Sequence, residues 1–308
     1  MIDTSIVIPA YNESARLGAG YARLAPVLDQ LGPDTEVVIV DDGSRDDTLG
    51  VARTVYGHLE HLLVVRQEPN RGKGAAVRLG IGLARGQRIL VTDADMAIRP
   101  RHFPDMLDAL DELDIAPGSR VQDGRVRYHT IVRSLAGDAF HLLVHHYAHL
   151  TLRDTQCGAK AFRAGPARLI ALLATTDRFA YDVEMLSLAQ RLGLRIGPVP
   201  VTWDDVRGSS VHLGSDSLGM LKDLRRLARL RYQNPVVQVR ADLEVAEASR
   251  AAREVRANGL VLARGSADAL IVLARDGAVA GAGIAASLGG QLRTSGLAEL
   301  ANRELVAL

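Results

Sequence analysis

The sequence predicts an α/β protein whose central sheet is mostly parallel, and three features of its amino-terminal third support this. Short apolar runs alternate with stretches in which apolar residues recur at a helical spacing. Each apolar run is continuous, as expected for a strand that is buried on both faces of a sheet. Short turns join the elements, which favours right-handed strand–helix–strand units. Functional residues are therefore expected beyond the carboxyl ends of the strands.

The first predicted strand covers residues 5–10, and Pro9 ends it because proline cannot donate to a strand ladder. A helix follows to about Leu31, with leucine and valine side chains recurring every three or four residues. The turn-forming run Gly32-Pro33-Asp34 ends that helix. These segments make up the first strand–helix unit of the sheet.

Three further strands are predicted at residues 36–40, 61–66 and 89–92. After the first of them, Ser44 and Asp47 resemble a capping box that starts a helix through about Tyr56. The run Asn-Arg-Gly-Lys-Gly at 70–74 opens the next helix. The alternation of strands and helices thus continues up to the strand at 89–92.

The composition is that of a globular protein able to bury a full core, since 47% of the 308 residues are hydrophobic and 24% are charged. Lys and Arg total 37 against 36 Asp and Glu, so no basic field points to nucleic acid. The single cysteine, Cys157, excludes an intramolecular disulfide framework and fits a reducing cytoplasm. The amino-terminal residues show no basic flank and no long apolar stretch, so no signal peptide is expected. No run of about 18 apolar residues occurs, so any membrane contact is expected to be peripheral.

Two carboxylates, Asp93 and Asp95, directly follow the apolar strand at 89–92. Because one small residue separates them, both side chains can turn toward the same hard cation. Mg2+ and Mn2+ accept carboxylate oxygens and keep their other coordination positions for water and phosphates. A solvated loop is the alternative interpretation of an isolated Asp-x-Asp, but the position after a buried strand favours a metal site.

Polar residues also follow the earlier strands. Asn12 and Glu13 follow the first, and Asp42 follows the second, where its carboxylate can accept hydrogen bonds from a base or a ribose. Arg71 and Lys73 follow the third, beside glycines that let the backbone approach a phosphate closely. A helix start with solvated charges is the alternative for this run. Its spacing matches neither a P-loop nor a dinucleotide fingerprint, which argues against an ATPase and a dehydrogenase. Of the ligands considered for this run, a nucleotide diphosphate bound together with a metal ion remains.

Four motifs occur in sequence order: Val-Ile-Pro-Ala-Tyr-Asn-Glu at 7–13, the segment 37–48 with Asp-Asp-Gly-Ser, the segment 70–78 with Asn-Arg-Gly-Lys-Gly, and Thr-Asp-Ala-Asp at 92–95. The series resembles the family 2 glycosyltransferases, which use a nucleotide-diphospho-sugar donor. The resemblance implies a GT-A-type, Rossmann-like nucleotide-sugar-binding domain. It implies that the nucleotide is held by Pro9, Ala10, Tyr11, Glu13 and Asp42, with Arg71 and Lys73 near it. It further implies that Asp93, Ala94 and Asp95 serve the ribose and the metal.

A second series extends the resemblance to roughly residues 3–233. It comprises the segments 118–120, 140–144, 154–163, 178–184 and 203–210. This series is similar to the branch that charges polyprenyl or dolichyl phosphates with a sugar, most of all to dolichyl-phosphate glucosyltransferases. Met96, Ala159 and Ser210 depart from the pattern of that branch, and they concern the acceptor and the sugar rather than the donor site. No counterpart of the amino-terminal membrane helix of the eukaryotic form is expected in this sequence.

The second half supplies cations for an acceptor phosphate, namely Arg120, Arg133, Lys160 and Arg163, with surface ion pairs as the alternative. A phosphate acceptor needs no base, because it is largely dianionic at neutral pH, whereas a hydroxyl acceptor does. Asp182 is the best-placed base by resemblance, and orienting the cations is its alternative role. We therefore expect loss of Arg163 to reduce the rate more than Asp182→Asn. Asp95, Lys160, Arg163 and Asp182 form the predicted catalytic set.

Three further features have ordinary structural interpretations. Cys157 lacks a predicted base beside it and is expected to be a small buried side chain rather than a nucleophile. His141, His145 and His149 share one helix face, where zinc binding is the alternative to a packed or acceptor-facing helix. Residues 216–231 read as a basic amphipathic helix, which either lies on an anionic membrane or packs on the catalytic domain.

The predicted domains are a catalytic domain at 1–235 and a carboxyl-terminal appendage at 236–308. In the appendage, helices are expected at 241–257 and 297–308, and strands at 259–263, 270–274 and 278–282. The pair Asp276-Gly277 predicts a hairpin turn between the last two strands. This Ala/Gly-rich tail therefore predicts a small α+β appendage, with homo-oligomer formation as its expected role.

These patterns together predict an inverting, metal-dependent glycosyltransferase with Mg2+ or Mn2+ as its cofactor. The expected donor is UDP-glucose, with GDP-mannose as the alternative, and the expected acceptor is a polyprenyl or dolichyl phosphate. The protein is expected in the cytoplasm, at the cytoplasmic face of the membrane, without a nucleic-acid partner. Two rival functions remain, a soluble glycosyltransferase with a hydroxyl acceptor and an inactive nucleotide-sugar-binding or scaffold protein.

Overall fold

A computed structural model divides the chain into two compact units, Met1–Ala228 and Arg229–Leu308. In the first unit the described residues are 2–122, 125–126, 143–144, 150, 152–178, 180–204 and 222–225. In the second unit they are 237–240, 261–264, 268–275 and 278–286. The domain boundary predicted after residue 235 falls near this division and stays a prediction.

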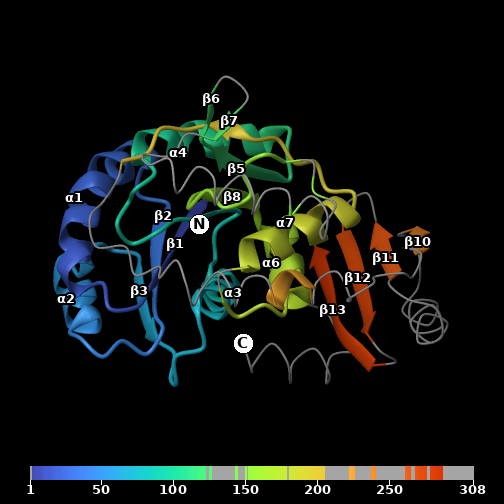
Figure 1. The fold of residues 1–308 in the computed structure, drawn as a ribbon, viewed down its shortest axis with the longest axis horizontal. Coiled ribbons are helices and arrows are strands. Elements are labelled where there is room, and N and C mark those ends of the chain that lie inside the picture. Colours follow the sequence, from blue (N-terminus) through green and yellow to red (C-terminus); the bar gives the residue numbers. More distant parts are fainter. Residues whose placement is uncertain are drawn as a thin grey trace. The chain divides into compact units, whose positions relative to one another are not determined.

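The first unit is organised around a seven-stranded sheet with the strand order β3-β2-β1-β4-β8-β5-β9 (Figure 1). Its strands are β1 (Thr4–Ala10), β2 (Thr35–Asp41), β3 (Leu62–Arg66), β4 (Arg88–Val91), β5 (Ile115–Ser119), β8 (Lys160–Arg163) and β9 (Val199–Pro200). Strands β3, β2, β1 and β4 are parallel, whereas β8 runs antiparallel to its neighbours β4 and β5. Two short strands, β6 (Val121–Gln122) and β7 (Arg125–Val126), pair separately. The predicted mostly parallel sheet is confirmed.

Helices cover both faces of this sheet. They are α1 (Ser14–Leu31), α2 (Thr48–Tyr56), α3 (Lys73–Leu83), α4 (Phe103–Asp108), α6 (Ala164–Leu173) and α7 (Tyr181–Arg191), with short 3-10 turns η1 (Pro100–His102) and η2 (Ala109–Asp111). Helix α1 packs against α2 and α4, and α3 packs against α6 and α7 (Figure 1). Ile6 and Ile8 of β1 belong to the same core cluster as Leu17 of α1. Val7 faces α3, since a Cβ at Gly80 would meet its Cγ1 at 2.3 Å. Successive β1 side chains are thus buried on opposite faces.

Most predicted elements of the amino-terminal part are confirmed. Helix α1 ends at Leu31, where Gly32 adopts φ +86, a conformation that favours glycine. Helix α3 begins at Lys73, inside the run at 70–74 that was expected to open it. The strands β2, β3 and β4 overlap the three predicted apolar runs. Local apolar spacing therefore located these elements correctly.

Strand β1 continues through Pro9 instead of ending there. Pro9 pairs in register with Val40 of β2. On the β4 side the ladder ends earlier, where Val7 O accepts the Thr92 N–H at 3.0 Å. Pro9 faces the same neighbour as Val7 and has no N–H to donate. The predicted end was therefore right for one edge of the strand and wrong for the other.

Helix α2 begins at Thr48, so the capping box predicted at Ser44 and Asp47 was wrong. The Asp46 carboxylate accepts the Thr48 N–H at 3.1 Å. Asp47 makes no capping hydrogen bond with its side chain. The Ser44 hydroxyl instead accepts the Asn12 N–H at 2.9 Å, which ties two loops together. Several short polar side chains in this run compete for the same backbone groups, and the local pattern does not rank them.

The second unit contains a four-stranded sheet with the order β10-β11-β12-β13. Its strands are β10 (Val237–Arg240), β11 (Val261–Arg264), β12 (Asp268–Arg275) and β13 (Ala278–Ala286). Arg275 lies opposite Ala278 in the β12–β13 pair, as the predicted two-residue turn requires. Strand β10 was not predicted. The helices expected at 241–257 and 297–308 lie outside the described residues.

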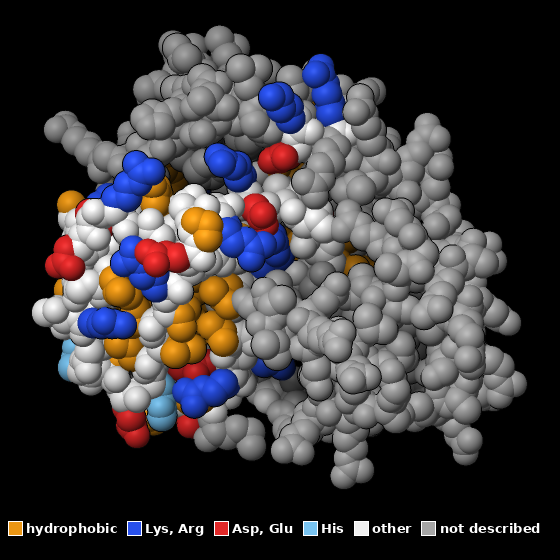
Figure 2. Space-filling view, turned by 90° about the horizontal axis from the view of Figure 1, so that it is seen from below, with side chains coloured by type: hydrophobic (Ala, Val, Ile, Leu, Met, Phe, Trp, Pro, Cys, Tyr) orange, Lys and Arg blue, Asp and Glu red, His pale blue; other side chains and the backbone are white. Residues whose placement is uncertain are grey.

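The described surface mixes charges and apolar side chains. Figure 2 shows hydrophobic side chains gathered on one face, with Lys, Arg, Asp and Glu side chains around them. Leu63 and Leu83 are each 37% exposed. Among the described helices, none has the length and hydropathy needed to span a bilayer. The helix predicted at 216–231 is described only at 222–225.

Candidate active site

The two carboxylates predicted to bind a metal lie on the loop that follows β4. Asp95 Oδ1 accepts the Ala97 N–H at 3.1 Å, which orients this carboxylate against its own loop. Met96 turns the chain with φ +48, a conformation that costs roughly 1–2 kcal/mol for a residue with a Cβ. Its side chain is fully buried in the core cluster. Packing therefore holds the loop in the shape that presents Asp95.

Asp93 is fixed from two directions. Its Oδ1 accepts a hydrogen bond from the Lys73 ammonium at 2.5 Å. Its Oδ2 lies against Gly158, where an added Cβ would come within 2.4 Å of it. A side chain at position 158 would therefore displace the Asp93 carboxylate, which gives Gly158 a physical role at the site.

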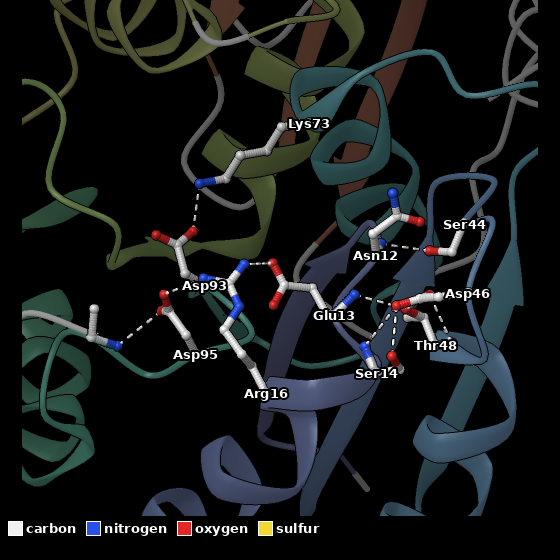
Figure 3. Close-up of polar contacts among 11 residues, drawn as sticks. Asn12, Glu13, Ser14, Arg16, Ser44, Asp46, Thr48, Lys73, Asp93 and Asp95 are labelled. Atoms are coloured by element: carbon white, nitrogen blue, oxygen red, sulfur yellow. Dashed lines mark hydrogen bonds and ion pairs between the residues drawn. The ribbon is translucent and has the colours of Figure 1, made fainter. Parts of the chain in front are cut away.

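Glu13 and Arg16 lie next to Asp95 and extend the cluster of charged side chains. Figure 3 shows the Arg16 guanidinium between the carboxylates of Glu13 and Asp95. Arg16 Nη1 lies 3.3 Å from Asp95 Oδ2, and its Nη2 donates to Glu13 Oε1. The Glu13 N–H donates to Thr48 Oγ1 at 2.7 Å. Glu13 Oε2 is buried and has no hydrogen-bond partner.

Arg16 was not among the predicted site residues. The contact between Arg16 and Asp95 joins residues 79 positions apart, so no local pattern contains it. One signal was present, because Arg16 lies in the first turn of α1, which has no acidic residue. A cation there is unfavourable next to the positive end of the helix dipole, unless carboxylates lie close by.

Burial and like charge act together on these carboxylates. Burial raises the pKa of Glu13, and Asp95 and Asp93 raise it further, against the opposing effect of Arg16. Burial also raises the pKa of Asp95, followed by the charge of Asp93. Burial alone would lower the pKa of Lys73, but Asp93 and then Asp182 outweigh it and raise this pKa. Lys73 therefore stays charged, and the neighbouring carboxylates of Glu13, Asp93 and Asp95 favour binding of an additional cation.

Asp42 fixes the loop before α3. Its Oδ1 accepts from Gln67 Nε2 at 2.6 Å and from the Arg71 N–H at 2.9 Å. Its Oδ2 accepts from Asn70 Nδ2 at 2.9 Å and from the Gly72 N–H at 2.7 Å. The residue is only 3% exposed. Asp42 thus shapes the Arg71 loop in this structure, and its predicted bond to a base or ribose stays a prediction.

The predicted phosphate-binding run packs against a loop before α7. Gly72 adopts φ +111, and a Cβ there would meet Asp177 O at 2.5 Å. A Cβ at Gly74 would meet Thr176 O at 2.3 Å. Both glycines are required by this close approach. The Arg71 side chain is 46% exposed, with Nη2 at 4.0 Å from Asp177, so it remains open to an anion.

Main-chain contacts bring the ends of β1, β2 and β4 together. Ala10 ends β1 and is buried, and the following Tyr11 is half-buried. Ala10 O accepts the Asp42 N–H at 2.8 Å. Ala94 presents its carbonyl to α1, where a Cβ at Gly20 would lie 2.1 Å from the oxygen. The contacts predicted between these residues and a nucleotide stay predictions.

Lys160 reaches the same sheet edge as the carboxylates. It lies opposite Val91, the last residue of β4, in the antiparallel β4–β8 pair. Its ammonium donates to Asp182 Oδ1 at 2.5 Å and to Cys157 O at 2.6 Å. The two side chains of this ion pair are 4% and 10% exposed. A carboxylate bound in this way orients a cation, which favours the second of the two roles considered for Asp182.

Arg120 is held by a bidentate pair. Its Nε and Nη2 each lie 2.8 Å from the Asp154 carboxylate, which also accepts the Arg120 N–H at 2.9 Å. Burial acts to raise the pKa of Asp154, but the hydrogen bonds from Arg120 outweigh it and lower this pKa. Arg120 also lies over Trp203, with its guanidinium carbon 6.0 Å from the ring centroid. Arg120 therefore makes an ion pair, but a largely buried one rather than the surface ion pair considered as its alternative role.

Arg163 lies at the opposite edge of the sheet, contrary to the prediction that it faces the acceptor. It pairs with Arg88, the first residue of β4. Its guanidinium donates to Leu110 O and Asp111 O, both at 2.7 Å. Because β8 is antiparallel to β4, its first residue, Lys160, lies near the site and its last residue, Arg163, lies away from it.

Cys157 is a buried core residue, as predicted. Burial raises the pKa of its thiol to about 11, so the nucleophilic thiolate is not formed at neutral pH. Predictions for Arg133, Ser210 and the helix bearing His141, His145 and His149 lie outside the described residues.

The donor set fits an oxygen-ligated divalent cation. Asp93 and Asp95 offer hard carboxylate oxygens, and the unused Glu13 Oε2 lies on the neighbouring loop. Within the described part of the chain, no group of three His, Cys, Asp or Glu side chains forms a complete protein-only metal site. Such a pair therefore suits Mg2+ or Mn2+, which would take its remaining ligands from water and phosphate oxygens.

The mostly parallel sheet, with paired carboxylates beyond its central strand β4, has a fold of the GT-A type. The family model described as Glycosyl transferase family 2 matches residues 5–171. The chain belongs to this family.

Curated relatives match beyond that segment. A dolichyl-phosphate beta-glucosyltransferase of Dictyostelium discoideum is 35% identical over 246 residues, covering 74% of this chain and 74% of the relative. A human protein of the same name is 35% identical over 248 residues, covering 74% and 75%.

Solved structures share the fold at lower identity. Glucosyl-3-phosphoglycerate synthase from Mycobacterium tuberculosis in complex with UDP aligns with a TM-score of 0.55 and 21% identity, covering 73% of this chain and 78% of that chain. The complex of the same enzyme with Mn2+, UDP and glucosyl-3-phosphoglycerate gives a TM-score of 0.53, with 21% identity and the same coverage of 73% and 78%.

Proposed function

We propose that this glycosyltransferase moves glucose from UDP-glucose to a polyprenyl or dolichyl phosphate, with inversion at the anomeric carbon and with Mg2+ or Mn2+ as cofactor. The observation that carries the proposal is the Asp93–Asp95 pair with Lys73 at the carboxyl edge of the sheet. The names of the relatives that match over nearly three quarters of the chain support glucose and a dolichyl phosphate. GDP-mannose is the alternative donor.

Cations of the chain bind and neutralise the donor diphosphate. The Arg71 side chain is half-exposed at the start of α3, and the Asp42 carboxylate fixes its backbone. The Lys73 ammonium lies beside Asp93. When bound, a divalent cation stabilises the negative charge on the departing diphosphate, and Asp93 and Asp95 would hold it. Fixed charges of this kind lower the barrier because they need no reorganisation as the leaving group departs.

The acceptor reaction needs no proton transfer. A phosphate oxygen of the acceptor forms a bond to the anomeric carbon, while the bond from that carbon to the diphosphate oxygen breaks. The electron pair of the broken bond leaves with UDP, and attack from the opposite face inverts the sugar. The acceptor is largely dianionic at neutral pH, so it attacks without a base. Asp182 serves as the partner of Lys160, which explains their buried ion pair.

The proposal is tested by incubating the protein with labelled UDP-glucose or GDP-mannose, a short polyprenyl phosphate and Mn2+. We expect organic-extractable label from UDP-glucose, loss of that label with EDTA, and a β-linked product from an α-linked donor. The matched control acceptor is the corresponding polyprenol, which has a hydroxyl in place of the phosphate. Label on the polyprenol alone would instead support the hydroxyl-acceptor function, and absence of turnover with every donor would support a binding or scaffold protein.

The nature of the acceptor indicates where in the cell the enzyme acts. Because a polyprenyl phosphate resides in a membrane, we place the enzyme at the cytoplasmic face, in peripheral contact with the lipid. Sedimentation of the protein with anionic vesicles that carry polyprenyl phosphate tests this placement.

We assign the appendage to homo-oligomer formation, through the edge strands of its sheet, and light scattering of the full chain tests that role.

A further inference from the structure

Arg16 lies between two carboxylates of the proposed metal site. Its Nη1 is 3.3 Å from Asp95 Oδ2, and its Nη2 is bonded to Glu13 Oε1. The side chains of Arg16 and Asp95 are 14% and 17% exposed. Their charges are therefore only weakly screened by solvent, and Arg16 acts directly on any cation that binds Asp95.

A positively charged side chain is unfavourable at the position that Arg16 occupies. It lies in the first turn of α1, where a positive charge faces the positive end of the helix dipole. Residues that break a local rule without a local gain are expected at functional sites. Glu13 adds a second observation, because its buried Oε2 has no hydrogen-bond partner. The Glu13–Arg16–Asp95 group is thus held together by charge, with one acceptor left unused.

The charges of the site favour a divalent cation more strongly when an anion accompanies it. Three carboxylates, Glu13, Asp93 and Asp95, face two cations, Arg16 and Lys73. The group therefore carries one net negative charge, and a divalent cation alone would make it positive. A diphosphate that arrives with the cation returns the balance to negative.

We propose that Arg16 is the internal counter-cation of Asp95 and Glu13, and that it makes tight binding of the divalent cation depend on the diphosphate of the donor. This role rests on the proposed function, because it assumes a metal at Asp93 and Asp95. Arg16 opposes the metal through its charge, and the diphosphate offsets that opposition. Metal and nucleotide then raise each other's affinity by the same factor, as linkage requires.

The test measures Mn2+ binding directly, by the electron paramagnetic resonance signal of free Mn2+, with and without UDP. Arg16→Gln and Arg16→Met remove the charge, and two such variants guard against one that fails to fold. Arg16→Lys keeps the charge. Arg23→Gln is the matched control, because Arg23 lies on the same helix and contacts Met96 O and Asp204 but none of the three carboxylates.

We expect the charge-free variants to bind Mn2+ without UDP about tenfold more tightly than the parent protein, and to show a smaller enhancement by UDP, because only the part due to ligation by phosphate oxygens remains. Arg16→Lys and Arg23→Gln should stay within about threefold of the parent. Equal or weaker Mn2+ binding by both charge-free variants would overturn the role of Arg16 while leaving the proposed function intact. A parent protein that binds no Mn2+ even with UDP would instead remove the metal from the proposed function, and this role with it.

Discussion

Two described residues of the site, Asn12 and Met96, have left-handed backbone conformations without being glycine, with φ +55 and φ +48. Asparagine tolerates this region, because its short polar side chain can bond locally. For Met96 the strain is roughly 1–2 kcal/mol, whereas truncating a fully buried methionine costs about 2–5 kcal/mol. The stabilisation from burying the Met96 side chain therefore exceeds the backbone strain, which accounts for a residue with a Cβ in this conformation.

Asp95→Ala should abolish turnover while the protein remains folded. Among the described residues, the Asp95 carboxylate bonds to the Ala97 N–H and to Arg16, and its removal also relieves repulsion from Asp93. The free energy of unfolding, measured by urea denaturation, should therefore change by about 1 kcal/mol or less. Turnover with UDP-glucose and Mn2+ dependence are measured on the folded variant. Unchanged turnover would remove Asp95 from the metal site.

Asp182→Asn should clearly lower the free energy of unfolding, whereas turnover of the folded variant should fall less than about 100-fold. It leaves the buried Lys160 ammonium without its carboxylate partner, and breaking a buried ion pair costs about 3–5 kcal/mol. Lys160→Met in the same chain removes the orphaned charge and should recover most of that loss. Urea unfolding of the single and double variants measures both changes.

The rates of the same variants separate the two roles considered for Asp182. A fall of about 100-fold or more in turnover of the folded Asp182→Asn protein, the range for loss of a general base, would contradict the positioning role. Arg163→Ala is the control, because Arg163 bonds to main-chain oxygens at the opposite edge of the sheet. Its dependence on acceptor concentration should match that of the parent.

At the scale of elements, the close packing of α1 on the metal loop is the contact that places Asp95. Gly20 of α1 lies so near the loop that a Cβ would come within 2.1 Å of Ala94 O. The oxygen belongs to the backbone, so no side-chain rotation can relieve the contact. Helix α1 also carries Arg16, so the same helix sets both the position and the counter-charge of Asp95.

Gly20→Ala should therefore destabilise the protein by roughly 1–3 kcal/mol, the usual cost of overpacking, and weaken Mn2+ binding. Gly18→Ala on the same helix is the matched control, since its Cβ would meet nothing within 4 Å. That change should stabilise the protein by about 0.5–1 kcal/mol, as alanine does in a helix interior. Thermal unfolding of the two variants compares them, and equal stability would contradict the close approach.

At the scale of the whole molecule, the described site residues all come from the first unit. The second unit is a separate compact sheet. A chain ending near residue 233 should therefore keep most of its transferase activity per folded molecule. Activity is measured after circular dichroism has established folding. A folded but inactive truncation would place part of the active site in the second unit.

Local sequence patterns predicted the strands and helices up to β4, and the loop that bears Asp93 and Asp95. Their apolar spacing and turn residues are local, so a window of a few residues contains the necessary information. Glu13, Asp42, Lys73 and Lys160 were likewise located by motif order. Motif order located Arg163 too, but it could not tell which end of its strand faces the site.

Packing between distant segments determines which of these side chains meet. The antiparallel insertion of β8 between β4 and β5 brings Lys160 to the site and takes Arg163 away from it. The packing of α1 on the loop after β4 brings Arg16 to Asp95 across 79 positions of sequence. The physical reason is the same in both cases, because strand direction and helix packing depend on contacts between distant segments, which no local spacing encodes.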